Sequence, residues 1–184
     1  MLVGLIGKTC SGKTTFFSAL TLVPAEISNR TFTTIKPNVG MGFVRKKCSC
    51  NELQIKCNNC KDGTRLIPVK IIDVAGLVPE AHKGKGMGNQ FLSDMMMADG
   101  IIHVVDISGS TDKNGNVTVA GTHDPEEDIK WVEEEIVYWM EGLLKKVDKK
   151  KIEAKTEKLE DALTKQVTGL GITKHQISDA LKEH

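Results

Sequence analysis

The sequence has no excess of charge of either sign and no long hydrophobic run, and both absences exclude classes of protein. Its 184 residues carry 25 basic and 24 acidic side chains, which give a formal net charge of +1. This balance argues against a whole-domain surface for nucleic acid or for an anionic membrane. The apolar runs are too short to span a membrane, and the start MLVGLIGK lacks the basic region of a signal peptide. We therefore expect a cytoplasmic protein with neither a membrane nor DNA as a partner.

Aromatic residues are also scarce, at 4% of the chain, although the hydrophobic fraction of 40% is ordinary for a globular protein. A chain of this length is expected to form one well-buried core. The five cysteines, in a cytosolic chain, are expected to be reduced, metal-bound or incidental more often than paired in disulfides.

Strand and helix patterns alternate over the first two thirds of the chain. Apolar segments that read as strands occupy residues 2–6, 38–46, 66–73 and 101–106. Helices are expected to begin near Gly12 and at about 89–98, and the first should turn four side chains toward a core. These are Phe16, Phe17, Ala19 and Leu20. The pattern predicts a three-layer α/β fold with one antiparallel hairpin, whose cysteine-rich tip spans residues 47–63.

From residue 124 onward the sequence predicts helices only. Asp124, Pro125 and Glu127 are typical of a helix start, as N-cap, first-turn proline and capping-box acid. One apolar stripe follows, formed by Ile129, Val132, Ile136, Met140, Leu143 and Val147. A second helix is expected to carry a further stripe, formed by Ile152, Leu159, Leu163, Val167 and Leu170. Gly169 or Gly171 would end that helix.

A third helix is expected to run toward His184, because Thr173 and Gln176 form a capping box. No strand pattern returns in this part of the chain. We therefore divide the chain into residues 1–123, the α/β part, and residues 124–184, a coiled-coil-like helical insertion.

The segment GKTCSGKT at residues 7–14 matches the P-loop pattern and lies between a predicted strand and a predicted helix. Gly7 and Gly12 allow backbone N–H groups to turn inward on phosphates, and Lys13 brings a positive charge to the β- and γ-phosphates. Thr14 offers its hydroxyl to Mg²⁺. The residues expected to contact the nucleotide here are Gly7, Lys8, Thr9, Cys10, Ser11, Gly12, Lys13, Thr14 and Thr15.

A second motif, DVAGLV at residues 73–78, supplies the other half of a nucleotide site. Asp73 ends an apolar strand, where an acid holds the shell of the Mg²⁺ ion, and Gly76 can bring its N–H to a γ-phosphate. Leu77 stands where Ras-type GTPases have a glutamine that positions the attacking water. Between the two motifs, Thr34 is expected to complete the metal shell in preference to Thr33. The catalytic set is then Lys13, Thr34 and Gly76, with Thr14, Thr34 and Asp73 as Mg²⁺ ligands.

The segment after Leu77 is rich in glycine, and Gly84, Gly86 and Gly88 would allow it to close on a triphosphate and relax after hydrolysis. His82 precedes these glycines. It is either a loop residue that faces solvent or a group that reaches the γ-phosphate.

Three segments together resemble the Obg-like, YchF-type translation-associated P-loop GTPases, most closely their archaeal and fungal branch. They are GKTCSGKTTFFSAL, FTTIKPNVG and DVAGLVPEAHKGKGMGNQFLSDMMMADGIIHVVD. The likeness covers about residues 1–140. It implies a Ras-like G domain that binds GTP and hydrolyses it slowly as a Mg²⁺-dependent switch, with the ribosome or translation factors as partners. It also implies a hydrophobic residue in place of the glutamine, as at Leu77, and a helical insertion such as residues 124–184.

The chain departs from this family at three points. Thr9 and Cys10 replace the usual Pro-Asn, and that asparagine is associated with potassium-assisted hydrolysis in related GTPases. The Asn-Lys-x-Asp motif that reads guanine is absent, so ATP remains an alternative ligand. The family continues to a small TGS domain, so we expect these residues to be the N-terminal portion of a longer protein or an incomplete gene product. The alternative function is a nucleotide-gated module that binds RNA or protein, with incidental or ATP-directed hydrolysis.

Four cysteines at the hairpin tip have the spacing C-x-C-x₆-C-x₂-C. They are Cys48, Cys50, Cys57 and Cys60. Four thiolates on a tight turn can bind Zn²⁺ tetrahedrally and staple a hairpin that has little core of its own. Because the C-x-C arm is shorter than the usual ligand spacing, free thiols are an equal alternative and a disulfide a lesser one.

Overall fold

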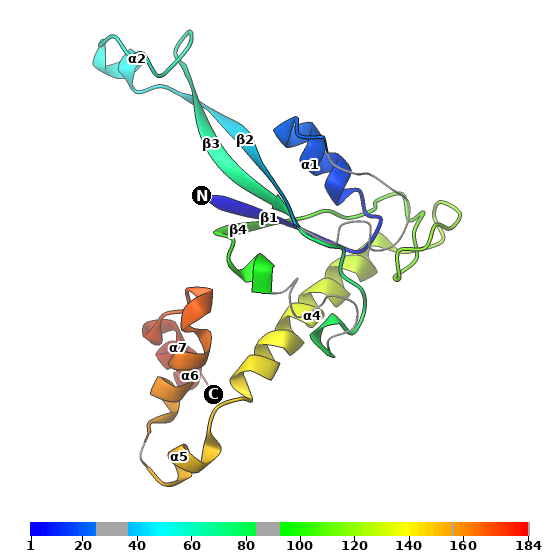
Figure 1. Ribbon diagram of the computed structural model, residues 1–184, viewed down its shortest axis with the longest axis vertical. Coiled ribbons are helices and arrows are strands. Elements are labelled where there is room, and N and C mark those ends of the chain that lie inside the picture. The colour runs from blue at the N-terminus through cyan, green and yellow to red at the C-terminus, as the bar shows by residue number, and fades with distance from the viewer. Residues whose placement is uncertain (25–36, 84–92, 156, 184) are drawn as a thin grey trace.

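A four-stranded sheet forms the centre of the protein in the computed structural model, which describes residues 1–24, 37–83, 93–155 and 157–183. The strands are β1 (Leu2–Ile6), β2 (Asn38–Lys47), β3 (Thr64–Asp73) and β4 (Gly100–His103). Their order in the sheet is β2-β3-β1-β4 (Figure 1). Strand β1 runs parallel to β3 and β4, whereas β2 and β3 form the expected antiparallel hairpin. Strand β4 ends three residues earlier than the sequence pattern indicated, at His103 instead of residue 106.

Helices form a large part of the remaining described chain. They are α1 (Lys13–Thr21), α2 (Cys50–Leu53), η1 (Ala81–Lys83), α4 (Pro125–Leu144), α5 (Lys149–Glu153), α6 (Leu159–Val167), η2 (Thr168–Leu170) and α7 (Lys174–Lys182). Residues 93–96 are also helical, within the helix expected at 89–98. None of the helices in these described ranges is long and apolar enough to cross a membrane.

Side chains alternate between the two faces of the sheet, and each face has its own apolar cluster. On one face Phe17 of α1 packs against Val3, Leu5, Val69 and Ile71. The other face packs against α4 in a cluster of Ile6, Val74, Leu77, Ala81, Met95, Val132 and Trp139. Helices thus cover both faces, which confirms the three-layer α/β fold (Figure 1).

Helix α1 buries less than its sequence indicated. Phe17 is fully buried, but Phe16 and Leu20 are 38% and 41% exposed, and Ala19 is exposed as well. The expectation that all four side chains face a core was therefore wrong. A nine-residue helix lying on a sheet presents one narrow stripe to it, and Phe17 occupies that stripe.

Helix α4 begins as its sequence indicates, because Pro125 lies in its first turn and the Asp124 carboxylate accepts a hydrogen bond from the backbone N–H of Glu126. Its buried face includes Val132 and Trp139, whereas Ile129, counted in the expected stripe, is 41% exposed. The helix is thus a direct part of the core that covers the sheet.

The expected second helix is instead divided into α5, α6 and η2. Lys155, just after α5, adopts a left-handed conformation with φ 55°, which a continuous helix cannot contain. Between Ile152 and Leu159 no apolar side chain longer than alanine is available to hold a helix against a neighbour. Two other expectations are confirmed: Gly171 ends this helical region at φ 72°, and Thr173 and Gln176 form the capping box of α7.

Candidate functional site

The P-loop connects the end of β1 to the start of α1 and turns sharply at three residues. Gly7, Cys10 and Gly12 all have positive φ, at 143°, 60° and 92°. A side chain at Gly7 would lie 2.3 Å from the carbonyl oxygen of Val104, so only glycine fits there. The loop therefore has the tight curvature that brings backbone N–H groups toward a bound anion.

Lys13 lies over this loop and is almost completely buried. Its ammonium group donates hydrogen bonds to the carbonyl oxygens of Gly7 at 3.1 Å and Lys8 at 2.6 Å. Burial lowers the pKa of Lys13 to about 8, although the negative potential of Asp73 and Cys10 opposes this shift. The structure thus holds a poorly solvated cation at the mouth of the loop, where an anion would stabilise its charge.

Asp73 ends β3 beside the P-loop and is completely buried. Its Oδ2 accepts hydrogen bonds from the Thr14 hydroxyl at 2.7 Å and from the Asn38 amide at 3.2 Å. Its Oδ1 is buried and has no hydrogen-bond partner among the described residues. A hydroxyl beside a carboxylate with a spare oxygen is a donor set that suits Mg²⁺, which prefers hard oxygen ligands. The residues present therefore fit the expected ion.

The DVAGLV segment joins the P-loop through its backbone. Leu77 N–H donates to the Gly7 carbonyl at 3.0 Å, and Thr9 N–H donates to the Leu77 carbonyl at 3.2 Å. The Leu77 side chain points the other way, into the apolar cluster under α4, and is 1% exposed. Gly76 lies directly against the loop, since an added Cβ would meet the Thr9 Cα at 2.6 Å and the Thr9 nitrogen at 2.8 Å.

We expect Gly76→Ala to destabilise the nucleotide-free protein by about 1–3 kcal/mol, because the added methyl overlaps the backbone of Thr9. Thermal unfolding followed by circular dichroism measures this change. Gly142→Ala in α4 is the matched control, since nothing lies within 4 Å of its added Cβ. Alanine is the better helix former there, so the control should be stabilised by up to about 1 kcal/mol. Equal stability of Gly76→Ala and the parent chain would contradict this account.

Several residues that the sequence assigned to the site lie outside the described ranges. They are Thr33, Thr34, Gly84, Gly86 and Gly88. Of the P-loop side chains, Thr9 and Ser11 are buried and Thr15 is exposed. Burial raises the pKa of the Cys10 thiol, and the positive charge of Lys13 opposes this shift.

The four hairpin cysteines lie together, but at the far end of β2 and β3 from Asp73. The roles assigned to all these residues stay predictions.

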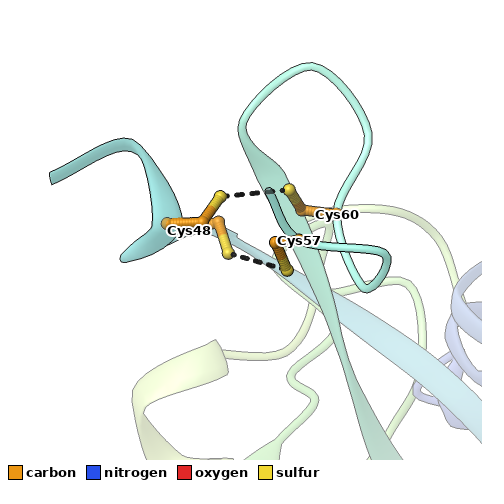
Figure 2. A group of neighbouring side chains, drawn as sticks. Cys48, Cys57 and Cys60 are labelled. Atoms are coloured by element: carbon orange, nitrogen blue, oxygen red, sulfur yellow. Dashed lines mark hydrogen bonds between the residues drawn. The ribbon is translucent and has the colours of Figure 1, made fainter. Parts of the chain in front are cut away.

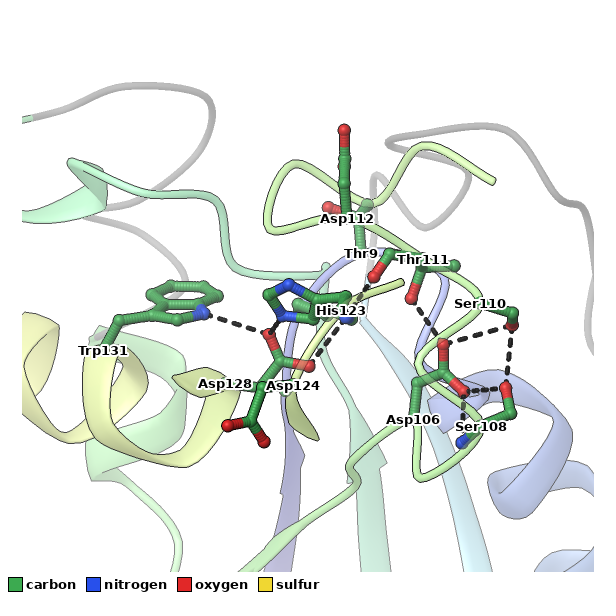
Figure 3. Close-up of polar contacts among 12 residues, drawn as sticks. Thr9, Asp106, Ser108, Ser110, Thr111, Asp112, His123, Asp124, Asp128 and Trp131 are labelled. Atoms are coloured by element: carbon green, nitrogen blue, oxygen red, sulfur yellow. Dashed lines mark hydrogen bonds and ion pairs between the residues drawn. The ribbon is translucent and has the colours of Figure 1, made fainter. Parts of the chain in front are cut away.

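A buried ion pair, which the sequence pattern did not reveal, ties the P-loop to α4 (Figure 3). The Lys8 ammonium lies 2.6 Å from the Asp128 carboxylate, and both side chains are 1% exposed. Asp128 also contacts His123 Nε2 at 2.8 Å and accepts a hydrogen bond from Trp131 Nε1 at 3.3 Å. Lys8 further donates to the Thr111 carbonyl at 2.8 Å. Its side chain is therefore directed to α4 and to the β4–α4 connection.

Asp106 organises the connection that carries Thr111 (Figure 3). Its carboxylate accepts hydrogen bonds from the hydroxyls of Ser108, Ser110 and Thr111 at 2.5–3.3 Å. Burial alone would raise the pKa of Asp106, but the hydrogen bonds from Ser108, Thr111 and Ser110 outweigh it and lower the pKa to about 2. An ionised carboxylate thus shapes the turn that presents the Thr111 carbonyl to Lys8.

Helix α4 also holds the segment that follows DVAGLV. The buried Glu135 carboxylate accepts hydrogen bonds from the backbone N–H groups of Glu80 at 2.6 Å and His82 at 3.0 Å. It lies 2.6 Å from His82 Nδ1, and the His82 ring packs on Tyr138 with centroids 5.1 Å apart. His82 is thus bound to α4 and is not the solvent-facing loop residue that its position suggested. Helix α4 therefore contacts both the P-loop and the segment that follows DVAGLV.

The P-loop, the adjoining carboxylate and the three-layer fold agree with comparisons to known proteins. A family model described as 50S ribosome-binding GTPase matches residues 2–152. The chain belongs to this GTPase family. A solved structure of a GTP-binding protein from Pyrococcus horikoshii has a TM-score of 0.72 and 37% identity, over 100% of this chain and 46% of that one.

Curated relatives of this GTPase bear two kinds of name. An uncharacterized GTP-binding protein of Methanocaldococcus jannaschii is 48% identical over 99% of this chain and 47% of its own length. The ribosome-binding ATPase YchF of Bacillus subtilis is 36% identical, and human Obg-like ATPase 1 is 33% identical, each over 73% of this chain. These matches cover 35% and 32% of the two relatives. The chain therefore spans less than half the length of each of these relatives, and the YchF-type, Obg-like resemblance is confirmed.

Proposed function

We propose that this GTPase-family chain binds GTP with Mg²⁺ in its P-loop and hydrolyses it slowly, as a switch that acts on the ribosome. The observation that supports this most directly is the pairing of Thr14 with Asp73 at 2.7 Å beside the buried ammonium of Lys13. Phosphate oxygens need a cation and N–H donors, and a divalent ion needs the hydroxyl and the carboxylate. The site offers all of these groups within one short loop and one strand end.

The side chains have separate tasks in the proposed reaction. Lys13 neutralises charge that develops on the β- and γ-phosphate oxygens, and its burial strengthens that interaction. Thr14 and Asp73 would hold Mg²⁺, which when bound shields the phosphate charges. Gly76, pressed against Thr9, allows its N–H to approach the γ-phosphate without steric interference. Phosphoryl transfer is catalysed mainly by such positioning and charge neutralisation.

The expectation of slow hydrolysis rests on Leu77. Its side chain is buried among Ile6, Val74 and Ala81, so it has neither the polar atoms nor the direction to orient an attacking water. A group supplied by a partner is worth about 10³–10⁵ in rate in related reactions. The name of the YchF relative includes ribosome binding, which makes the ribosome the first partner to test.

The base that the protein selects is a separate question. Relatives are named both as GTP-binding proteins and as ATPases. The chain contains no Asn-Lys-x-Asp motif, so its residues offer no known reader of guanine. We propose GTP because the family model and the most similar of the cited relatives carry that name, with ATP as the alternative.

Single-turnover hydrolysis separates these possibilities. Protein in excess is mixed with γ-labelled GTP or ATP and Mg²⁺, with and without ribosomes, and phosphate release is followed. We expect slow release from GTP, faster release with ribosomes, and no release when EDTA removes Mg²⁺. Faster turnover of ATP would reassign the base. Tight Mg²⁺-dependent binding with no hydrolysis would favour the alternative, a nucleotide-gated module for RNA or protein, because a buried Leu77 fits that function as well.

A further inference from the structure

The tip of the β2–β3 hairpin projects from the sheet and has almost no core of its own (Figure 1). Strand pairing continues out to Lys47 and Thr64, and the tip lies beyond that pair. In the fully described stretch from Phe43 to Pro68, every residue is exposed except Gly63 and the four cysteines. A segment of this kind cannot be held by apolar burial, so its fixed turns need another source of stability.

The four cysteines converge from two separate turns of the tip (Figure 2). Cys50 is the first residue of α2 and Cys48 lies two residues before it, and both are buried. Cys57 and Cys60 come from the turn that leads back into β3. All four sulfur atoms lie within 4.8 Å of one another. No other ligand-bearing group of three or more His, Cys, Asp or Glu side chains occurs in the described ranges.

The sulfur positions match a metal site better than a disulfide. Cys48 and Cys57 have their sulfurs 3.8 Å apart, and Cys50 and Cys60 have theirs 3.4 Å apart. A disulfide requires about 2.05 Å, whereas four sulfurs placed tetrahedrally about 2.3 Å from Zn²⁺ lie roughly 3.8 Å from each other. Both pairs are thus near the separation expected in a tetrahedral thiolate site, and all four sulfurs lie within 4.8 Å of one another.

The backbone around the sulfurs supports the same reading. The N–H of Asn59 donates to the sulfur of Cys57 at 3.4 Å, so this sulfur already acts as an acceptor, as a thiolate ligand would. The N–H of Cys48 bonds to the carbonyl of Gly63 at 2.8 Å and brings the two turns together. Left-handed conformations at Gln54 and Asp62, with φ 53° and 48°, close the turns tightly.

We propose that Cys48, Cys50, Cys57 and Cys60 bind one structural Zn²⁺ as four thiolates, which joins the two turns of the hairpin tip. Each thiol gives its proton to solvent when it coordinates, and no oxidant or reductant is involved. With four protein ligands the ion has no open position for substrate, so its role is structural. The β2–β3 ladder between the tip and Asp73 spans ten paired residues, about 30 Å, so the ion lies far from the P-loop.

Metal analysis of the purified protein tests this proposal. We expect about one zinc per chain, released by a mercurial reagent that titrates thiols, and a cobalt-substituted protein with the strong visible bands of tetrahedral thiolate coordination. The double variant Cys57→Ser/Cys60→Ser should lose the zinc. The control Cys10→Ser should retain it, because Cys10 lies in the P-loop, outside the cluster.

Limited trypsin digestion gives a second readout that needs no variant. Chelation of zinc should expose Lys56 and Lys61, on either side of the Cys57–Cys60 turn, to faster cleavage, and added zinc should restore protection. Nucleotide binding should not change, so failure of the zinc proposal is distinguishable from failure of the proposed function. Four reactive thiols without metal, a disulfide, or iron in place of zinc would each overturn the proposal.

Discussion

Replacing Asp128 with alanine is expected to lower the free energy of unfolding by about 3–5 kcal/mol, because it leaves the buried Lys8 ammonium without its carboxylate. The variant also deprives His123 and Trp131 of the oxygen that they contact. For a chain of this size, about 1 kcal/mol shifts the melting temperature by roughly 2–4 °C, so we expect a fall of about 6–20 °C. Thermal and urea unfolding of the nucleotide-free protein measure it.

A matched surface pair provides the control. Lys145 and Glu141 are also 2.6 Å apart, but their side chains are 69% and 50% exposed. Because water screens such a pair, Glu141→Ala should change stability by less than about 1 kcal/mol. Equal effects of Glu141→Ala and Asp128→Ala would show that burial does not govern the strength of the Lys8–Asp128 pair.

A double-mutant cycle measures how much the Lys8–Asp128 ion pair itself contributes to the free energy of unfolding. We expect Lys8→Met combined with Asp128→Ala to cost less than the sum of the two single changes, because each single change leaves one buried charge unpaired and the double variant leaves neither. The double variant should still be less stable than the parent chain, because the Thr111 carbonyl loses its donor Lys8 and the Trp131 N–H loses its acceptor Asp128. Strict additivity would mean that the ion pair does not couple the P-loop to α4.

Helix α4 contacts two segments of the proposed nucleotide site, the P-loop and the segment after DVAGLV. It binds the P-loop through Asp128 and the segment after DVAGLV through Glu135, and the two residues lie seven apart, two turns along one face. A movement of either segment would therefore change a contact with the same helix. Its other end leads along the chain into α5 and α6.

Local patterns in the sequence were sufficient to predict most of the fold. Strand β1 was predicted with its true limits, because a short apolar run that ends at a glycine is typical of a buried strand. The hairpin, Gly171 and the Thr173 capping box were also predicted, since each depends on neighbours in sequence. Phe16, Leu20 and Lys155 are among the failures, and there the outcome depends on how much surface a distant element offers.

The site was predictable only in part, for the same reason. P-loop and strand-end motifs have fixed spacings, so Lys13, Thr14 and Asp73 could be identified as neighbours before the structure was known. The partners of Lys8 and His82 could not, because Asp128 and Glu135 are 120 and 53 positions away and look like ordinary acids of a helix surface. Burial of those two carboxylates is the signal, and sequence alone does not show it.

We expect Lys13→Ala to weaken Mg²⁺-dependent binding of GTP about 10- to 150-fold, which isothermal titration calorimetry can measure. A hydrogen bond from a charged group is worth about 1.5–3 kcal/mol net, and Lys13 is the buried ammonium that faces the phosphate loop. The unfolding midpoint without nucleotide should stay near that of the parent chain. Removing the ammonium relieves the burial that lowers its pKa to about 8, but it also removes positive charge from beside Asp73.

This combination distinguishes a binding role from a structural one. Replacing a lysine that mainly supports the fold would lower the stability of the nucleotide-free protein, as replacing Asp128 is expected to do. A lysine kept for its ligand carries a charge that the empty protein solvates poorly, and the phosphates supply the compensation on binding. Lys145→Ala, on the exposed end of α4, controls for loss of positive charge alone and should leave affinity unchanged. If Lys13→Ala binds GTP as the parent chain does, the P-loop is not where this protein holds the nucleotide.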